Sequence, residues 1–229
     1  MRVDSVNTAI DNVDEVILQL KQVGLQRKDF ALEDISFQIK AGYITILTGN
    51  NGAGKSTLLS ILMGVNRKYT GKVELYGEDL KSHDRKNLEK IGYISEEPTF
   101  FMECDAIENE MFLSPHYRNW DKKLYREKLK ELEVPVSTPL KLLSRGNYIK
   151  FQLTWAMAHC AELYVLDEPT AGLDPVYKKI FYRQLQELVA QGAGILMATN
   201  LAEDVEQIAD YRMVMEDGRL VKVEEVLAV

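Results

Sequence analysis

The sequence predicts an α/β fold built around a buried parallel sheet, and three observations carry this prediction. An apolar run at residues 44–47 leads directly into a glycine-rich segment and then into residues with helical spacing. From about residue 149 onward, apolar strand-like runs alternate with amphipathic helical stretches. In the first third, short β-rich runs with short connections alternate in part between apolar and polar residues, which is typical of an antiparallel sheet. We therefore expect a parallel-sheet core with an antiparallel β subdomain beside it.

Length and composition limit the class of protein. The 229 residues are enough for one large α/β domain or two small ones. Hydrophobic residues make up 46% and charged residues 28%, as in ordinary soluble proteins. The formal net charge of −7 argues against nucleic acid as a partner and against direct binding to anionic lipid. No apolar run approaches the roughly 18 residues of a membrane-spanning helix, and we expect no signal peptide. A cytoplasmic protein that reaches a membrane only through a partner fits these features.

The first half of the chain predicts an extension followed by strands. Residues 1–13 show no clear period, so we expect them to form an N-terminal extension and residues 14–229 to form a single domain. Short β-rich runs at residues 16–20, 35–39 and 72–76 are expected to pair in the antiparallel subdomain.

Helical spacing dominates the middle of the chain. After a buried strand at residues 91–94, the pattern turns helical, and Asp121 is a plausible N-cap of one helix. The apolar positions of that helix are Tyr125, Leu129 and Leu132. We expect an α-helical subdomain at about residues 99–160, inserted into the α/β core. Cys160 falls in an apolar stretch and is predicted to be a buried free thiol in a reducing compartment.

The last third returns to strand and helix alternation. An apolar strand at residues 163–166 ends in two acidic residues, and a helix is expected after Pro175. A further buried strand covers residues 194–199, and Asp217-Gly218 predicts a terminal hairpin.

The glycine-rich segment fits the phosphate-binding loop pattern G-x-x-x-x-G-K-[ST] without exception. Its residues are Gly49, Asn50, Asn51, Gly52, Ala53, Gly54, Lys55, Ser56 and Thr57. Gly52 and Gly54 let successive N–H groups point at phosphate oxygens on a helix N-terminus. Lys55 is expected to reach the β- and γ-phosphates, and the Ser56 hydroxyl to ligate Mg²⁺. A chance glycine turn is the plainer alternative, but the flanking strand and helix favour a P-loop NTPase core that binds a nucleoside triphosphate.

Two acids at the end of a buried strand complete this chemistry. Asp167 is expected to hold Mg²⁺ directly or through a water, and Glu168 to orient or deprotonate the attacking water. An Asp-Glu pair after a strand is weak evidence alone, because surface acids are common there. It becomes strong in a chain with a phosphate-binding loop about 110 residues earlier.

Together these motifs resemble the ATP-binding cassette (ABC) family in order and in spacing. The resemblance rests on residues 49–57, 143–147, 163–169 and 171–175, and it covers the chain from about Val16 onward. Residues 96–101 and 116–121 look most like ATPase subunits of bacterial exporters whose permease is a separate polypeptide.

The resemblance implies a mechanism in which two cassettes trap two ATP molecules between them. The partner is a second copy of the chain or a sister ABC subunit, and an integral membrane permease is driven through the inserted helices. The residues that would act in trans, on the partner's ATP, are Ser144, Arg145, Gly146 and Asn147 of the signature segment, and Asp174. A plain helix cap is the alternative for Ser144 and its neighbours. The cofactors implied are ATP and Mg²⁺.

Glu96 departs from the family pattern, which usually has glutamine at this position. A carboxylate can ligate Mg²⁺, so Glu96 is a candidate catalytic residue and metal ligand. When ionised it cannot donate a hydrogen bond, and it adds negative charge near Glu168. The alternative is that Glu96 points into solvent.

Three further departures concern other parts of the site. Asn200 stands where the family has a histidine that contacts the γ-phosphate, and it cannot carry charge, so we expect slow turnover. Asn147 replaces the usual glutamine of the signature segment, a change we expect to be tolerated. The aromatic residue that stacks on adenine is missing before the loop; Arg27 or Phe30 could replace it, although Phe30 could also be core. Residues 100–102 could receive a permease helix or be buried core in equal measure.

The leading hypothesis is the ATP-hydrolysing subunit of an ABC exporter, peripheral on the inner face of the membrane through its permease. One alternative is a degenerate partner that holds ATP in a heterodimer while a sister subunit hydrolyses it, which Glu96 and Asn200 motivate. The other is a soluble ABC ATPase with no role in transport.

Overall fold

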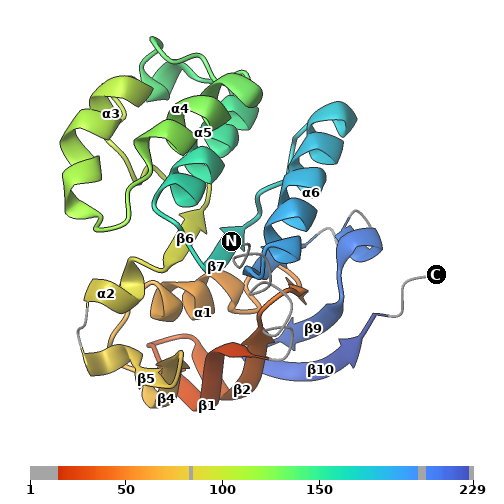
Figure 1. Cartoon of the computed structure of the whole chain (residues 1–229). Coiled ribbons are helices and arrows are strands. Elements are labelled where there is room, and N and C mark those ends of the chain that lie inside the picture. The colour runs from red at the N-terminus through yellow and green to blue at the C-terminus, as the bar shows by residue number, and fades with distance from the viewer. Residues whose placement is uncertain (1–14, 83–84, 201–204, 227–229) are drawn as a thin grey trace, which may run out of the picture.

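The computed structural model describes residues 15–82, 85–200 and 205–226, and it contains two sheets and a group of helices (Figure 1). One sheet has four strands in the order β2-β1-β4-β5, and the other has six in the order β10-β9-β3-β8-β7-β6. The strands are β1 (Val16–Gln26), β2 (Ala31–Lys40), β3 (Ile44–Thr48), β4 (Thr70–Leu75), β5 (Glu78–Asp79), β6 (Ile91–Ile94), β7 (Leu163–Asp167), β8 (Gly194–Thr199), β9 (Tyr211–Glu216) and β10 (Arg219–Glu225). The helices are α1 (Lys55–Leu62), α2 (Arg85–Leu88), α3 (Ala106–Leu113), α4 (Lys122–Glu131), α5 (Arg145–Ala158) and α6 (Pro175–Ala190).

The six-stranded sheet is the parallel core. Strands β6, β7, β8, β3 and β9 run parallel, and only β10 pairs antiparallel, with β9. Every residue of β3 and β8 is buried, because helices or the second sheet cover both faces. The predicted fold class, a P-loop NTPase-type parallel core with an antiparallel subdomain and inserted helices, is confirmed.

The antiparallel sheet packs on the core through α1. One hydrophobic cluster joins apolar side chains of β1 and β2 to the buried face of α1 and to one face of the parallel strands. The members contributed by α1 are Leu58, Leu59, Ile61 and Leu62. The first turn of this helix is formed by the last three residues of the phosphate-binding loop, and the helix ends before Gly64, whose φ of 67° stops it.

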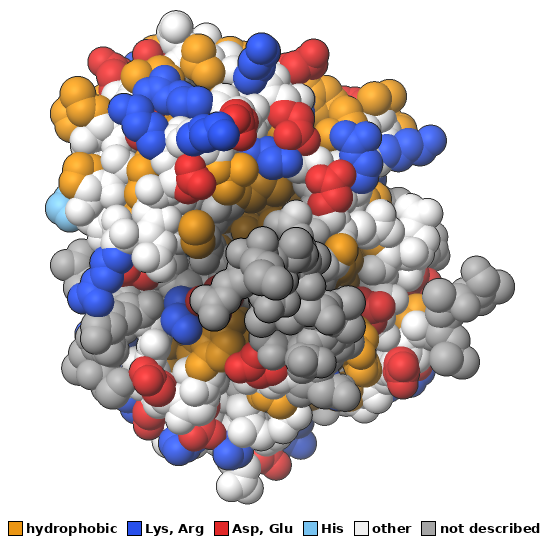
Figure 2. Space-filling model, viewed as in Figure 1, with side chains coloured by type: hydrophobic (Ala, Val, Ile, Leu, Met, Phe, Trp, Pro, Cys, Tyr) orange, Lys and Arg blue, Asp and Glu red, His pale blue; other side chains and the backbone are white. Residues whose placement is uncertain are grey.

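The inserted helices form a lobe of their own, in which α3, α4 and α5 lie together above the strands (Figure 1). Their core is aromatic: Trp155 of α5 packs against the rings of Trp120, Tyr125 and Phe100. Asp121 caps α4 by accepting a 2.8 Å hydrogen bond from the Leu124 N–H, as predicted. The surface of this lobe mixes Lys and Arg with Asp and Glu rather than gathering one sign of charge (Figure 2).

The structure corrects the sequence-based reading in two places. Strand β1 extends to Gln26 and β2 starts at Ala31, well beyond the predicted runs, because β-bulges near Gln22 and Asp34 interrupt the alternation of apolar residues. Cys160 is exposed rather than buried: it follows the end of α5 at a φ of 59°, which turns its side chain out of the helix face. The predicted hairpin at Asp217-Gly218 is confirmed. The expected extension at residues 1–13 lies outside the described residues.

A buried asparagine holds the loop that begins the helical lobe. Asn109 of α3 is fully buried and bonds both backbone groups of Phe101 (3.0 and 3.1 Å) and the Asp105 carbonyl (2.9 Å). We predict that Asn109→Ala lowers the free energy of unfolding by about 2 to 4 kcal/mol, because it leaves backbone groups unpaired in the interior. Chemical denaturation measures this, with the exposed Asn119→Ala expected to change it by less than about 0.5 kcal/mol. Equal effects of the two changes would contradict the prediction.

Candidate nucleotide-binding site

The candidate site lies where the carboxyl ends of β3, β7 and β8 meet. The phosphate-binding loop follows β3, Asp167 ends β7 with Glu168 directly after it, and Asn200 follows β8. Because Thr48 pairs with Thr199 and Asp167 pairs with Ala198, these three segments reach the same edge of the sheet.

The loop itself is a turn that only glycine can form at its key positions. Gly54, at a φ of 108°, caps α1, and a Cβ there would lie 2.6 Å from Cζ of Phe30. The loop opens into a cavity of about 480 Å³ on the N-terminus of α1. Its lining residues are Arg27, Phe30, Asn50, Asn51, Gly52, Gly54, Lys55, Ser56, Thr57 and Glu168. Both candidates for contacting a base, Arg27 and Phe30, therefore share the cavity with the loop.

Lys55 points into this loop. Its side chain is 6% exposed, and its Nζ donates to the Gly49 carbonyl at 2.6 Å. The same Nζ lies 3.7 Å from Oε1 of Glu168. A cation held among carbonyls beside a carboxylate is well placed to exchange these contacts for phosphate oxygens.

Asp167 has the features of a ligand for Mg²⁺. Burial raises the pKa of its carboxyl, while a hydrogen bond from Ser56 opposes that shift. Its Oδ1 is buried with no hydrogen-bond partner among the residues that the structure describes. A hard carboxylate oxygen beside a hydroxyl is the donor set that Mg²⁺ takes, with waters and phosphate oxygens completing its shell. The residues present therefore fit a Mg²⁺ ion.

Glu168 sits at the centre of the site with a strained backbone. Its φ is 49°, unusual for a residue with a side chain, and its N–H donates to the Ala198 carbonyl at 2.9 Å. Its Oε2 accepts a hydrogen bond from the Asn200 N–H at 3.2 Å. Its carbonyl accepts another from Nη2 of Arg145 at 3.1 Å. Asn200 thus adjoins the Glu168 carboxylate through its backbone, while its own side chain is exposed.

Glu96 forms an ion pair with Arg145 and does not line the nucleotide cavity. Its side chain is 50% exposed but paired with a cation, so it does not simply point into solvent. Sequence reasoning did not foresee this pair. The sequence does show two residues of opposite charge, Glu96 and Arg145, within the segments that carry the resemblance. It does not show that these two residues are in contact.

The residues expected to act in trans lie outside the cavity of their own chain. Ser144 caps α5, its Oγ accepting a 3.3 Å bond from the Asn147 N–H, so the plainer alternative of a helix cap also holds. Asp174 caps α6 in the same way, accepting from the N–H groups of Val176 and Tyr177. Gly146 lies against Tyr177 and Leu173.

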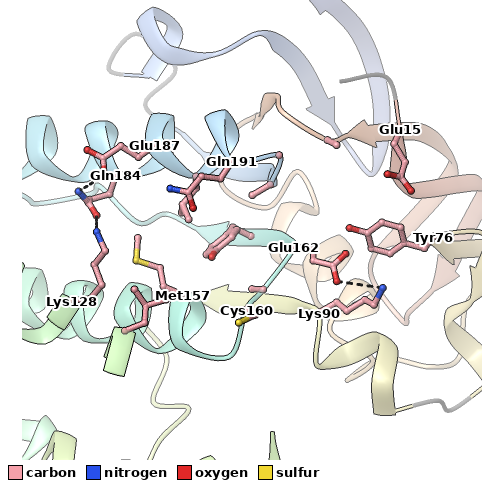
Figure 3. Close-up of a pocket in the computed structure, with 17 residues that line it drawn as sticks. Glu15, Tyr76, Lys90, Lys128, Met157, Cys160, Glu162, Gln184, Glu187 and Gln191 are labelled. Carbon is pink, nitrogen blue, oxygen red and sulfur yellow. Dashed lines mark hydrogen bonds and ion pairs between the residues drawn. The ribbon is translucent and has the colours of Figure 1, made fainter. Parts of the chain in front are cut away.

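A larger cavity, of about 660 Å³, lies at the opposite edge of the sheet (Figure 3). It is bounded by the ends of α5 and α6 and by the residues that precede β7 and β8. Two of its lysines have polar partners within the cavity: Lys90 forms an ion pair with Glu162 at 3.4 Å, and Lys128 donates a hydrogen bond to the amide oxygen of Gln184 at 3.3 Å. None of its described lining residues belongs to the phosphate-binding loop, so the smaller cavity is the candidate nucleotide site.

Comparison with known proteins decides the family. The sequence model described as ABC transporter matches residues 32–171, more than half of the chain. The chain belongs to the ABC transporter family. The predicted resemblance is therefore confirmed, and ABC proteins of this type are ATPases.

Curated ABC relatives include both directions of transport. The chain is 32% identical over 196 residues to an uncharacterized ABC transporter ATP-binding protein of Bacillus subtilis, and 31% identical over 193 residues to the Nod factor export ATP-binding protein I of Rhizobium leguminosarum. Each alignment covers 82% of this chain and 62% of the relative. The ribose import ATP-binding protein of Hahella chejuensis is 32% identical over 208 residues, covering 86% of this chain and 41% of the relative. The chain therefore spans less than two thirds of the length of these curated relatives.

Solved ABC structures share the fold. An ATP-binding subunit of an ABC transporter superposes with a TM-score of 0.82 at 26% identity, covering 92% of this chain and 90% of the other. A nucleotide-free ATP-binding cassette gives a TM-score of 0.80 at 21% identity, with 93% and 92% covered. Among the described residues, no helix is long and apolar enough to cross a membrane.

The raised pKa of Asp167 predicts that its ionised carboxyl lowers the stability of the fold while it supports Mg²⁺-dependent nucleotide binding. A carboxyl with a raised folded pKa binds its proton more tightly in the folded state, so folding becomes less favourable as pH rises above the usual value of 3.8. Asp167→Asn removes this penalty, and we expect a higher unfolding midpoint at pH 7 with no gain near pH 3. The same change should abolish the Mg²⁺ dependence of nucleotide binding.

Thermal unfolding at the two pH values and titration of a fluorescent ATP analogue with and without Mg²⁺ measure these effects. Asp34→Asn, the same chemical change at an exposed carboxyl, is the control and should alter neither quantity. A lower midpoint for Asp167→Asn at pH 7 would show that its carboxylate stabilises the fold.

Proposed function

We propose that the chain is the ATP-binding and ATP-hydrolysing subunit of an ABC exporter, working as a dimer that drives a separate membrane permease. One observation carries the proposal: Lys55 of the phosphate-binding loop and Glu168, which follows β7, approach within 3.7 Å in one cavity that also holds Ser56. A cation and a hydroxyl of the loop therefore meet a carboxylate from a distant part of the chain where a triphosphate fits. ATP and Mg²⁺ are the cofactors.

The residues of the site divide the work of phosphoryl transfer. Backbone N–H groups of residues 49–57 and the N-terminus of α1 bind phosphate oxygens, and Lys55 balances their charge. Ser56 and Asp167 hold Mg²⁺, which neutralises negative charge on the phosphates. Glu168 orients the attacking water or accepts its proton, and Asn200 donates a hydrogen bond toward the γ-phosphate. Glu96 is a further metal ligand only in a state in which it has left Arg145.

Dimerisation is proposed because Ser144, Gly146 and Asn147 of the signature segment do not line the nucleotide cavity of their own chain. Ser144, Gly146 and Asn147 surround the N-terminus of α5, a 14-residue helix whose positive end suits a γ-phosphate. With Arg145 and Asp174, these residues are proposed to close on ATP held by a second copy or by a sister ABC subunit.

An apolar patch on the helical lobe suits the permease. Phe101, Met111 and Phe112 are 51%, 63% and 47% exposed, and the rings of Phe101 and Phe112 meet edge to face at 6.0 Å. Phe100 instead packs on Phe151 and Trp155 in the core. We call Phe101, Met111 and Phe112 the docking patch and propose that it receives a cytoplasmic helix of the permease, placing the chain on the inner face of the membrane.

The exporter direction draws support from the Nod factor export relative, of which the chain covers 62%, against 41% of the ribose import relative. The sequence identities to the two relatives are nearly equal, so the support for export comes from the larger share of the export relative that the chain covers. Co-purification of the chain with its membrane partner, followed by transport into inside-out vesicles, tests the direction; ATP-dependent substrate movement toward the cytoplasmic side would overturn it.

We predict that ATP drives association when hydrolysis is blocked. Glu168→Gln keeps a hydrogen-bonding side chain at this position but removes the general base, so it should form a stable dimer with ATP and Mg²⁺. Light scattering during gel filtration measures the mass, and Glu168→Gln with Lys55→Ala is the control that should stay monomeric. A monomer at every ATP concentration for Glu168→Gln, alone or with a sister ABC subunit, would contradict the dimer mechanism.

Asn200→His is expected to raise the rate of hydrolysis by about tenfold to a hundredfold, because it restores a donor that can carry charge at the γ-phosphate. The Michaelis constant should change little, since the phosphate-binding loop is untouched. Steady-state phosphate release measures both, with Asn200→Ala as the control that should not gain. If the wild-type and Asn200→His chains both lack hydrolysis while still binding ATP, the degenerate-partner alternative replaces this proposal.

A further inference from the structure

Three side chains on one face of α5 hold the segment that follows β6. Gln152 bonds both backbone groups of Ser95, at 3.1 and 2.8 Å, and the Tyr148 hydroxyl accepts from the Thr99 N–H at 3.3 Å. Arg145 pairs with the Glu96 side chain. Positions 145, 148 and 152 recur at the helical spacing that places them on one face. The segment that carries Glu96 is therefore fixed to α5.

Arg145 differs from the other two because it also reaches the catalytic end of the sheet. Its Nη2 donates to the Glu168 carbonyl at 3.1 Å, and a Cβ on Gly172 would lie 3.3 Å from its Nη1. One guanidinium thus touches the β6 segment and the β7 segment together. Its planar set of N–H donors allows contacts in both directions, which lysine could not reproduce with the same geometry.

Resting on the function proposed above, we propose that Arg145 is a positioning residue for hydrolysis within its own chain. It fixes the strained backbone of Glu168 from the carbonyl side, while the N–H of Glu168 is held by Ala198. A left-handed backbone is less stable than the ordinary one for a residue with a side chain, so it persists only where neighbouring groups hold it.

The same contact explains how the chain tolerates a carboxylate at position 96. Glu96 adds a negative charge near Glu168, and Arg145 supplies the matching positive charge by direct pairing. The two residues form one unit: Glu96 keeps the guanidinium in place, and the guanidinium holds the Glu168 carbonyl. Glu96→Gln alone therefore leaves Arg145 without its charged partner instead of restoring an ordinary site.

Arg145→Met tests the proposal, because it keeps an unbranched, flexible apolar stem and removes every donor. We expect the turnover number to fall about tenfold to a hundredfold, the range for losing a hydrogen bond from a charged donor. The Michaelis constant for ATP should stay within about twofold. In the nucleotide-free chain at low concentration, the backbone amides between residues 169 and 173, which are those of residues 170–173 because residue 169 is a proline, should exchange with deuterium faster. Tyr148→Phe is the matched control, because Tyr148 lies on the same face of α5 as Arg145. The change removes the acceptor of the Thr99 N–H and should leave exchange at 169–173 unchanged.

A charge exchange separates positioning from simple stabilisation. Glu96→Arg with Arg145→Glu restores an ion pair but offers the Glu168 carbonyl no donor from position 145. We expect the unfolding midpoint to recover while turnover and exchange at 169–173 stay as in Arg145→Met. Recovery of turnover by the exchanged pair, or an unchanged rate in Arg145→Met, would overturn the proposal.

The two proposals fail in different ways. If the wild-type chain shows no hydrolysis but Arg145→Met accelerates exchange, the enzymatic function fails and the hold of Arg145 on Glu168 stands. If the wild-type chain hydrolyses ATP and neither exchange nor turnover responds to Arg145→Met, the positioning role fails and the enzymatic function stands.

Discussion

The parallel register of β3, β8 and β7 is the constraint on which the site depends. Thr48 opposite Thr199, and Asp167 opposite Ala198, bring residues from three distant parts of the sequence to one edge. A slip of one residue in a buried strand would turn its side chains to the opposite face of the sheet. Because β3 and β8 are buried along their whole length, such a slip would disturb both hydrophobic clusters at once. The precision of the site therefore comes from the packing of the core.

Charge is balanced within this edge rather than by solvent. Lys55 lies beside Glu168, and Arg145 lies beside Glu96, so each candidate catalytic carboxylate has its own cation. Asp167 accepts a hydrogen bond from Ser56 and is attracted by Lys55, but its buried Oδ1 has no hydrogen-bond partner in the described part of the chain, which burial makes costly. A divalent cation that binds this carboxylate would remove the free-energy cost of leaving it buried and partly unpaired.

The sequence predicted those parts of the fold and site that depend on local pattern. The phosphate-binding loop, the caps at Asp121 and Gly64, and the hairpin at Asp217-Gly218 each follow from residue types that few other backbone shapes accept. Strand lengths in the antiparallel sheet could not be read, because bulges break the period on which the reading relies. The pairing of Glu96 with Arg145 was also hidden, since 49 residues separate them and no local rule links a strand end to a distant helix start. The expected roles of the individual site residues stay predictions.

The position of Arg145 bears on how the helical lobe and the sheet communicate. Coupling between two sites requires a physical contact with more than one arrangement, and proximity alone is not enough. Phe101 of the docking patch is joined to α3 through Asn109, and Thr99, two residues earlier, is joined to α5 through Tyr148. The next contact along the same helix face is Arg145 with Glu96, and there the lobe meets the Glu168 backbone.

Gln152 is buried and bonded on both sides, so it holds α5 and Ser95 together as one body. Arg145 and Glu96 are both partly exposed and joined by charge, so theirs is the contact in this series that can open without unpacking the core.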